Sequence, residues 1–118
     1  METLYRYVFT YEGKEFGGLF RGMNKALELL ESLDAHNDDY NDVDYMFGEL
    51  EYMLEVPKDM PSSVKFYYTE FGYNKVKDKV AELADILNEY YIDISLYKTT
   101  VGDRKVVYRD EYQVALED

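Results

Sequence analysis

The chain has 118 residues, among them 25 Asp or Glu, 13 Lys or Arg, 14 Tyr and one His, with no Cys or Trp. Its formal net charge of −12 argues against indiscriminate binding to nucleic acid or anionic lipid, which needs a surplus of Lys and Arg. The lack of Cys excludes disulfides, thiolate zinc sites and thiol nucleophiles, and the length predicts a single domain over residues 1–118.

Residues 4–11 alternate between two faces with the period of a β-strand. One face carries only aromatic side chains: Tyr5, Tyr7, Phe9 and Tyr11. We expect this face to pack beneath helices rather than to stack on nucleic-acid bases, because stacking platforms also need a basic groove. Residues 12–14 offer a turn, and a second strand is expected to run through Phe20. Gly17-Gly18 predicts a bulge or a close backbone approach within that strand.

After Gly22 the hydrophobic period becomes that of a helix. The first helical pattern has Asn24 as a candidate N-cap and the following apolar face: Met23, Ala26, Leu27, Leu30 and Leu33. Residues 36–41 are polar and are predicted to form a loop. A second helix should stop before Pro57, because the residue that precedes a proline is pushed out of the helical region. Its apolar face comprises Val43, Met46, Phe47, Leu50, Met53 and Leu54.

Residues 57–63 are expected to connect the two halves of the domain, and residues 64–68 alternate as a strand. The strongest helical pattern of the chain follows: Tyr73, Val76, Val80, Leu83, Leu87 and Tyr90. The pattern then predicts a strand with an apolar stripe, a hairpin turn at Gly102-Asp103 and a return strand over 106–108. The stripe consists of Ile92, Ile94 and Leu96. A turn or bulge over 109–111 should precede a last strand over 112–116, because Asp110 would otherwise lie on the apolar face.

This order of elements, roughly β-β-α-α-β-α-β-β, predicts an α+β fold in which an antiparallel β-sheet has helices packed on one face. The N-terminal residues show no basic lead followed by an apolar run, so we expect no signal peptide. No window approaches the length of an apolar membrane span. The expected location is therefore the cytoplasm, with no membrane partner.

Few residues offer catalytic or metal-binding chemistry. His36 is the single His, so a catalytic triad or a two-His metal site cannot be assembled within one chain, and we expect a solvated loop histidine. The Asn37–Asp44 run fails as a calcium loop, because Asp42 stands where the loop needs glycine and Gly48 where it needs glutamate. We expect no enzymatic activity, no cofactor and no metal site.

The negative charge is concentrated in one part of the chain. Residues 26–57 carry ten Asp or Glu and no Lys or Arg, a net charge of −10, while residues 1–25 and 58–109 are each at +1. The simplest interpretation of this concentrated charge is a helix face exposed to solvent. A second alternative is internal neutralisation of the predicted acidic loop by Lys75, Lys77 and Lys79.

The third interpretation is a binding surface on the second helix. That helix contains no Lys or Arg that could pair with its acids along the helix, and Tyr45 and Tyr52 lie one heptad apart among them. We expect these residues to dock on a basic protein, such as a nuclease or another nucleic-acid-binding enzyme, without direct contact to nucleic acid. The predicted partner-binding residues are Asp38, Asp39, Asp42, Asp44, Tyr45, Glu49, Glu51, Tyr52 and Glu55.

At the level of class, the chain resembles the small, acidic, cysteine-free inhibitors carried by phages and other mobile elements. The acidic stretch 26–57, with Tyr40, Tyr45 and Tyr52, carries this resemblance. It implies an anti-defence function, anti-CRISPR or anti-restriction, in which the protein occupies a nucleic-acid-binding groove as a DNA mimic. An immunity protein that neutralises a nuclease toxin is an alternative, as are a structural or assembly protein and a small enzyme or ligand-binding domain that uses scattered carboxylates and tyrosines. The oligomeric state is left open.

Overall fold

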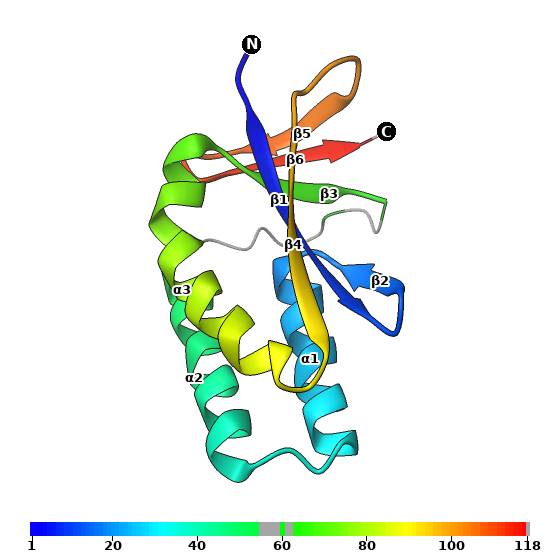
Figure 1. Cartoon of the computed structure of the whole chain (residues 1–118). Helices are drawn as coiled ribbons and strands as arrows, with labels where there is room; N and C mark the ends of the chain where they lie inside the picture. Colours follow the sequence, from blue (N-terminus) through cyan, green and yellow to red (C-terminus); the bar gives the residue numbers. More distant parts are fainter. Residues whose placement is uncertain (55–59, 61–62, 118) are drawn as a thin grey trace.

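The computed structural model describes residues 1–54, 60 and 63–117 (Figure 1). It is an α+β fold with a six-stranded antiparallel sheet and three helices, which confirms the predicted class and the approximate order of elements. In chain order the elements are β1 (Leu4–Tyr11), β2 (Lys14–Gly17), α1 (Leu19–Ser32), α2 (Asn37–Met53), β3 (Lys65–Tyr68), α3 (Glu70–Asn88), β4 (Ile92–Thr99), β5 (Lys105–Arg109) and β6 (Gln113–Glu117).

β1 is the central strand of the sheet. On one side it pairs along its whole length with β4, from Leu4 opposite Thr99 to Tyr11 opposite Ile92. On the other side it pairs with β2 near its end and with β3 near its start, and β3 continues the sheet to β6 and β5. Figure 1 shows β3, β5 and β6 crossing the direction of β1 and β4 at a steep angle. The sheet is therefore split beside the middle of β1.

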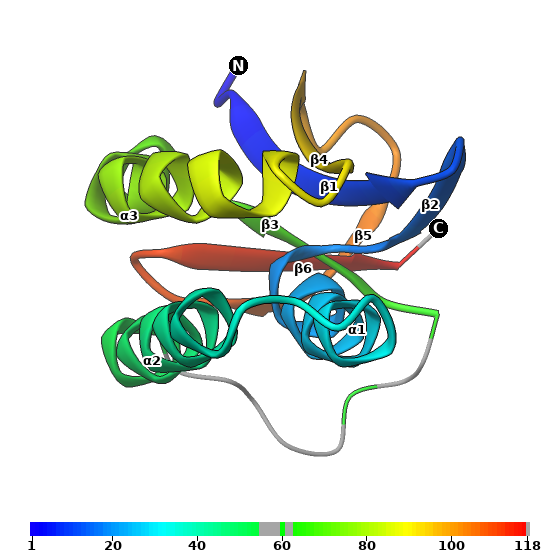
Figure 2. The ribbon, with the colours of Figure 1, turned by 60° about the horizontal axis from the view of Figure 1, so that its bottom comes forward.

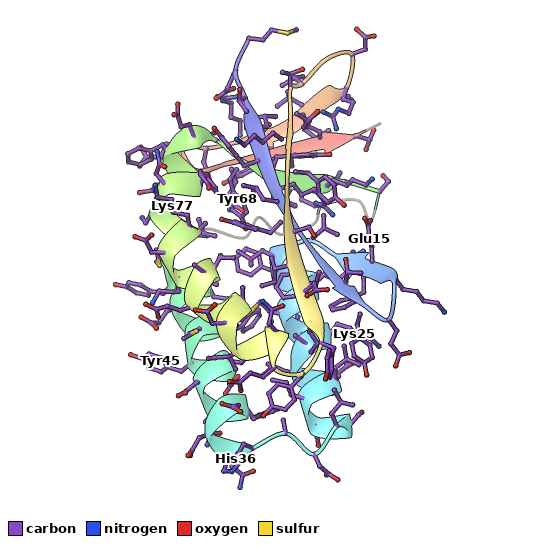
Figure 3. All side chains as sticks on the ribbon, in the orientation of Figure 1. Glu15, Lys25, His36, Tyr45, Tyr68 and Lys77 are labelled. Atoms are coloured by element: carbon purple, nitrogen blue, oxygen red, sulfur yellow. The ribbon has the colours of Figure 1, made fainter. Side chains whose placement is uncertain are left out.

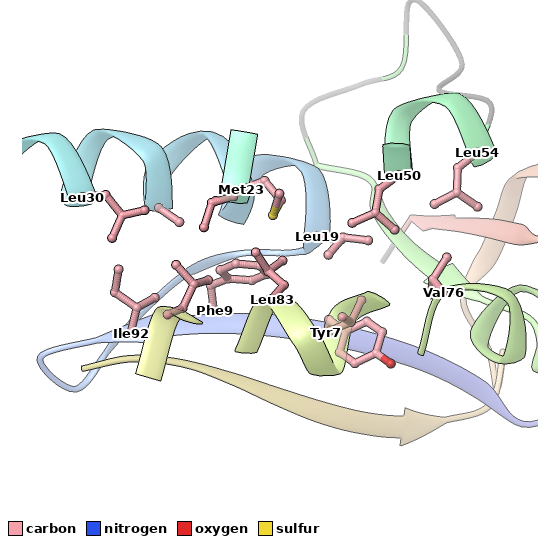
Figure 4. Close-up of a cluster of buried hydrophobic side chains, with 14 of the residues drawn as sticks. Tyr7, Phe9, Leu19, Met23, Leu30, Leu50, Leu54, Val76, Leu83 and Ile92 are labelled. Carbon is pink, nitrogen blue, oxygen red and sulfur yellow. The ribbon is translucent and has the colours of Figure 1, made fainter. Parts of the chain in front are cut away.

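α1 and α3 pack over the aromatic face of β1, and α2 packs against these two helices; Figure 2 shows α1 and α2 lying side by side. Tyr7 and Phe9 are buried in the core, and the ring of Tyr5 stacks on that of Tyr73 in α3 at a centroid distance of 4.4 Å. This confirms the expectation that the aromatic face packs beneath helices. The helices contribute the other core side chains seen in Figure 4, including Leu19, Met23, Leu30, Leu50, Leu54, Val76 and Leu83. Burial of each such side chain is worth roughly 1.5–3 kcal/mol.

The start of α1 differs from the prediction. The second strand ends at Gly17 rather than continuing through Phe20, because Gly17 has a φ of +129° that turns the chain out of the sheet. α1 then begins at Leu19, with Gly18 rather than Asn24 at the N-cap. The predicted bulge is confirmed, since the β1–β2 register shifts so that Phe9 faces Gly17 while Thr10 faces Glu15.

The start of α2 also differs. The segment 36–41 is not a loop, because α2 begins at Asn37 with His36 at its N-cap. Polar residues suit this first turn, where Asp38 and Asp39 interact favourably with the positive end of the helix dipole. The first buried side chain of α2 is that of Val43, and for this reason the apolar pattern reveals the helix only from that residue onwards.

The C-terminal strands pair differently from the prediction. Gly102 and Asp103 do form a turn, but the strand that follows it, β5, pairs with β6 and not with β4. The predicted turn over 109–111 is confirmed, and it joins this hairpin: the Asp110 carboxylate accepts hydrogen bonds from the backbone N–H groups of Tyr112 and Gln113, at 2.8 and 2.7 Å. The predicted connector over 57–63 lies largely outside the described residues.

The first turn of α3 is held against this same turn. The Thr69 hydroxyl caps α3 by accepting a hydrogen bond from the Gly72 N–H, and it donates one to the carbonyl of Glu111. Gly72 is in such close contact that a Cβ atom there would lie 2.1 Å from the carbonyl oxygen of Tyr112. By contrast, a Cβ atom at Gly48, in the middle of α2, would meet nothing within 4 Å.

These two glycines provide a matched test of the packing. We expect Gly72→Ala to lower the free energy of unfolding by about 2 kcal/mol or more, because the backbone of the turn must move. Gly48→Ala should instead raise it by about 0.5–1 kcal/mol, because alanine favours an exposed helix interior. Urea denaturation measures both values, and equal effects of the two substitutions would contradict the packing of α3 on the turn after β5.

Candidate functional site

The outward face of α2 carries most of the predicted partner-binding residues. Tyr45 is 71% exposed and Tyr52 is 94% exposed, and Figure 3 shows Tyr45 pointing away from the body of the molecule. The exposed carboxylates of this face are those of Asp38, Asp42, Asp44 and Glu51. Glu55 lies outside the described residues. We call the exposed set Asp38, Asp42, Asp44, Tyr45, Gly48, Glu51 and Tyr52 the α2 face.

A hollow lies in the α2 face at Gly48. It has a volume of about 380 Å³, and Tyr45 and Tyr52 line it together with Asp44, Glu49 and Met53. Tyr45, Gly48 and Tyr52 share one side of the helix because they are three and four residues apart. A Lys or Arg side chain fits the chemistry of this hollow, since aromatic rings and carboxylates both attract a cation.

Two of the predicted carboxylates are engaged within the molecule. The Asp39 carboxylate accepts a hydrogen bond from the hydroxyl of Tyr90, which lies just after α3. The Glu49 carboxylate forms an ion pair with Lys79 of α3, at an N–O distance of 2.9 Å. These contacts fasten α2 to α3, so Asp39 and Glu49 position the α2 face rather than belong to its exposed part.

Of Lys75, Lys77 and Lys79, only Lys79 forms an ion pair with α2 among the described residues. Lys79 pairs with Glu49, which lies outside the 38–44 segment that the sequence indicated. Lys75 lies 4.0 Å from the ring centroid of Tyr112, and Lys77 lies 6.0 Å from that of Tyr73. Of the ion pairs within residues 1–54, 60 and 63–117, only this one involves α2.

Other candidate chemistry is sparse in the described part of the chain. The side chain of His36 is exposed at the start of α2, and its backbone N–H donates a hydrogen bond to the hydroxyl of Tyr90. No three His, Cys, Asp or Glu side chains among the described residues are placed to hold a metal ion. None of the described helices is long and apolar enough to cross a membrane.

Sequence reasoning missed two features of the site. It did not identify the hollow, although a glycine between two tyrosines at helical spacing is a signal that could have suggested it. It also did not assign the contact between Tyr90 and Asp39, because the two residues are 51 positions apart and only the tertiary fold brings them together.

The contact between Tyr90 and Asp39 predicts a shifted titration. The hydrogen bond to the carboxylate raises the pKa of the Tyr90 phenol above its ordinary value of 10.0. Since the pKa is higher in the folded state than in the unfolded one, the contact stabilises fully below about pH 10 and its contribution is lost as the pH rises through the folded value. Ring carbon chemical shifts follow this titration. Asp39→Asn should lower the pKa of Tyr90 and the control Asp38→Asn should leave it unchanged, whereas the same pKa in all three proteins would rule the contact out.

The family models, curated proteins and solved structures with which the chain was compared contain no match to it. Functional inference therefore rests on the chemistry of the chain's own surfaces. The α2 face joins four exposed carboxylates, which form no ion pair with the described residues, to a hollow between two exposed tyrosines.

Proposed function

We propose that this chain is a non-enzymatic inhibitor that binds a basic, nucleic-acid-handling protein through its α2 face and takes the place of DNA there. One observation carries the proposal: the α2 face joins exposed carboxylates that have no basic neighbour on the helix to a hollow between Tyr45 and Tyr52. Local helix stability does not account for this pattern, because a helix selected for stability alone would alternate acids with bases.

The row of exposed carboxylates supports the comparison with DNA. The four exposed carboxylates of the α2 face lie between Asp38 and Glu51. At a rise of 1.5 Å per residue this segment is about 20 Å long, so the α2 face carries one exposed carboxylate per about 5 Å, against roughly 3.4 Å per phosphate along one DNA strand. A groove that attracts a phosphate backbone would attract this helix by the same long-range field.

The tyrosines supply anchor residues that can be buried on binding, which carboxylates alone do not provide. Surface charges speed association and set orientation, whereas affinity comes mostly from a few buried anchors, among which Tyr is enriched. Tyr45 and Tyr52 can both be buried on binding because they are largely exposed in the free protein. An Arg or Lys from the partner would enter the hollow between them.

The α2 face is also held in place before binding. Val43 and Leu50 fix α2 in the core with fully buried side chains, and the contacts of Asp39 and Glu49 tie its two halves to the region of α3. A preorganised surface loses less entropy on association, which favours tight binding.

Assembly of identical copies through this face is disfavoured, because like charges would be brought together. The remaining functions, anti-CRISPR, anti-restriction and immunity to a nuclease toxin, would use the same contact and differ in the identity of the basic partner. Of these we favour an anti-defence inhibitor, on the resemblance of class alone.

The test compares two variants of equal charge. In the first, Asp38, Asp42, Asp44 and Glu51 are replaced by the corresponding amides. In the control, four exposed acids away from α2 are replaced in the same way: Asp85, Asp93, Asp103 and Glu111. The immobilised proteins are used to capture partners from a lysate of the source cell at rising salt. We expect the wild type and the control to retain a basic nucleic-acid-binding protein, the first variant to lose it, and duplex DNA to displace it. Retention by all three proteins, or resistance to excess DNA, would contradict the proposal.

A second variant separates the hollow from the charge. Gly48→Gln fills the hollow without changing the net charge and is compatible with a helix. With the captured partner, we expect it to weaken binding about tenfold at every salt concentration while leaving the salt dependence unchanged. The four-amide variant should instead flatten the salt dependence. Unchanged affinity of Gly48→Gln would show that the hollow makes no contact.

A further inference from the structure

A second surface feature lies where the sheet splits beside β1. Between β2 and β3, a cavity of about 300 Å³ opens next to the start of α1. Three basic side chains line it, those of Arg6, Arg21 and Lys65, and its aromatic lining residues are Tyr7, Phe20, Phe66 and Tyr68. Among the residues that the structure describes, no Asp or Glu lines the cavity, in a chain that has almost twice as many acids as bases.

The backbone makes room for the cationic groups at this point. Gly18 ends the turn between β2 and α1, and a Cβ atom there would lie 3.0 Å from Nη1 of Arg6. The side chain of Arg21 lies against Gly17, where a Cβ atom would be 3.0–3.2 Å from its carbon atoms. Because neither glycine has a side chain, both arginines can lie close to the backbone at Gly17 and Gly18, where they line the cavity.

Arg6 is held by neutral groups. Its Nη1 donates a hydrogen bond to the carbonyl of Phe66 at 3.1 Å, and its guanidinium lies 5.7 Å from the ring centroid of Tyr67. Burial lowers the pKa of Arg6, and the charge of Arg21 lowers it further. The guanidinium groups of Arg6 and Arg21 therefore repel each other, and that of Arg6 is partly shielded from water.

This positive charge is not balanced by ion pairs. Among the described residues, no carboxylate forms an ion pair with Arg6, Arg21 or Lys65. Glu15 is near enough for its field to favour the charged form of Arg6, but its carboxylate accepts a hydrogen bond from Tyr97 instead. The phenols of Tyr7 and Tyr68 are uncharged at neutral pH, and burial raises their pKa further.

We propose that this cavity binds a small phosphate monoester that carries an aromatic ring, as nucleoside monophosphates do. The phosphate would lie between Arg6 and Arg21 within reach of Lys65, because three cations suit a dianion and guanidinium groups bind phosphate oxygens in pairs. The aromatic body would pack on the rings of Phe20 and Phe66. The site is built from β1, β3 and the start of α1, so it does not depend on the function proposed for the α2 face.

The experiment is a titration followed by amide chemical shifts, with phenyl phosphate as the probe. We expect saturable shifts at Leu19, Phe20 and Phe66, with weaker binding of inorganic phosphate, which lacks the ring, and of benzyl alcohol, which lacks the charge. Arg21 and Lys65 are exposed, so Arg21→Gln and Lys65→Gln should fold normally. Loss of a charged hydrogen-bond donor should weaken phenyl phosphate binding about tenfold or more in each variant.

Lys14→Gln is the control, since Lys14 is exposed and is not part of the cavity lining. It should bind phenyl phosphate as the wild type does. The proposal is overturned if phenyl phosphate gives no saturable shifts at the cavity, if the shifts centre on another surface, or if Lys14→Gln weakens binding as much as Arg21→Gln. Equal affinity for phenyl phosphate and benzyl alcohol would also overturn it.

Discussion

The pairing of β1 with β4 holds in register the side chains against which α1 and α3 pack, and α2 packs in turn on those two helices. The eight residues of β1 are all matched on that side, and the register turns Tyr7 and Phe9 toward the helices. A slip of one residue would turn the aromatic face to solvent and remove the surface on which α1 and α3 pack. The positions of both candidate sites follow from this one strand.

The cavity depends on β1 because two strands share the edge of β1 that β4 does not occupy. β2 and β3 each pair with only one end of that edge, which leaves a gap between them. The chain turns at Gly17 out of β2 and into α1 beside this gap. The location of the acidic surface depends on the same core. Since a buried carboxylate is costly, the side of α2 that contacts the core is formed by residues such as Val43 and Leu50, and the acids are left on the outside. The fold thus places a basic cavity and an acidic helix on separate elements.

The sequence predicted best those features that depend on local periodicity. The helix from Glu70 to Asn88 was expected because its apolar residues recur every three or four positions, and β1 because its aromatic residues alternate. The turn at Asp110 was expected from a single carboxylate that could not lie on an apolar face. The acidic, tyrosine-bearing helix was also expected, and the structure exposes most of its predicted residues. Whether they bind a partner stays a prediction.

The features that were missed depend on tertiary contacts or on short polar turns. The early start of α2 is polar apart from Tyr40, and no local pattern distinguishes the pairing of β5 with β6 from its pairing with β4. The cavity brings Arg6, Arg21 and Lys65 together from three elements, which no local pattern predicts. The hollow at Gly48 needed the exposure of Tyr45 and Tyr52 as well as their spacing.

Hydroxyl-radical footprinting of the tyrosines, with and without the captured partner, tests the central claim most directly. The reactivity of a side chain reports its exposure, and Tyr91, which is 82% exposed and lies outside the α2 face, serves as an internal control. The account predicts that partner binding protects Tyr45 and Tyr52 and leaves Tyr91 unchanged. Protection of Tyr91 with no change at Tyr45 and Tyr52 would place the partner elsewhere and contradict it.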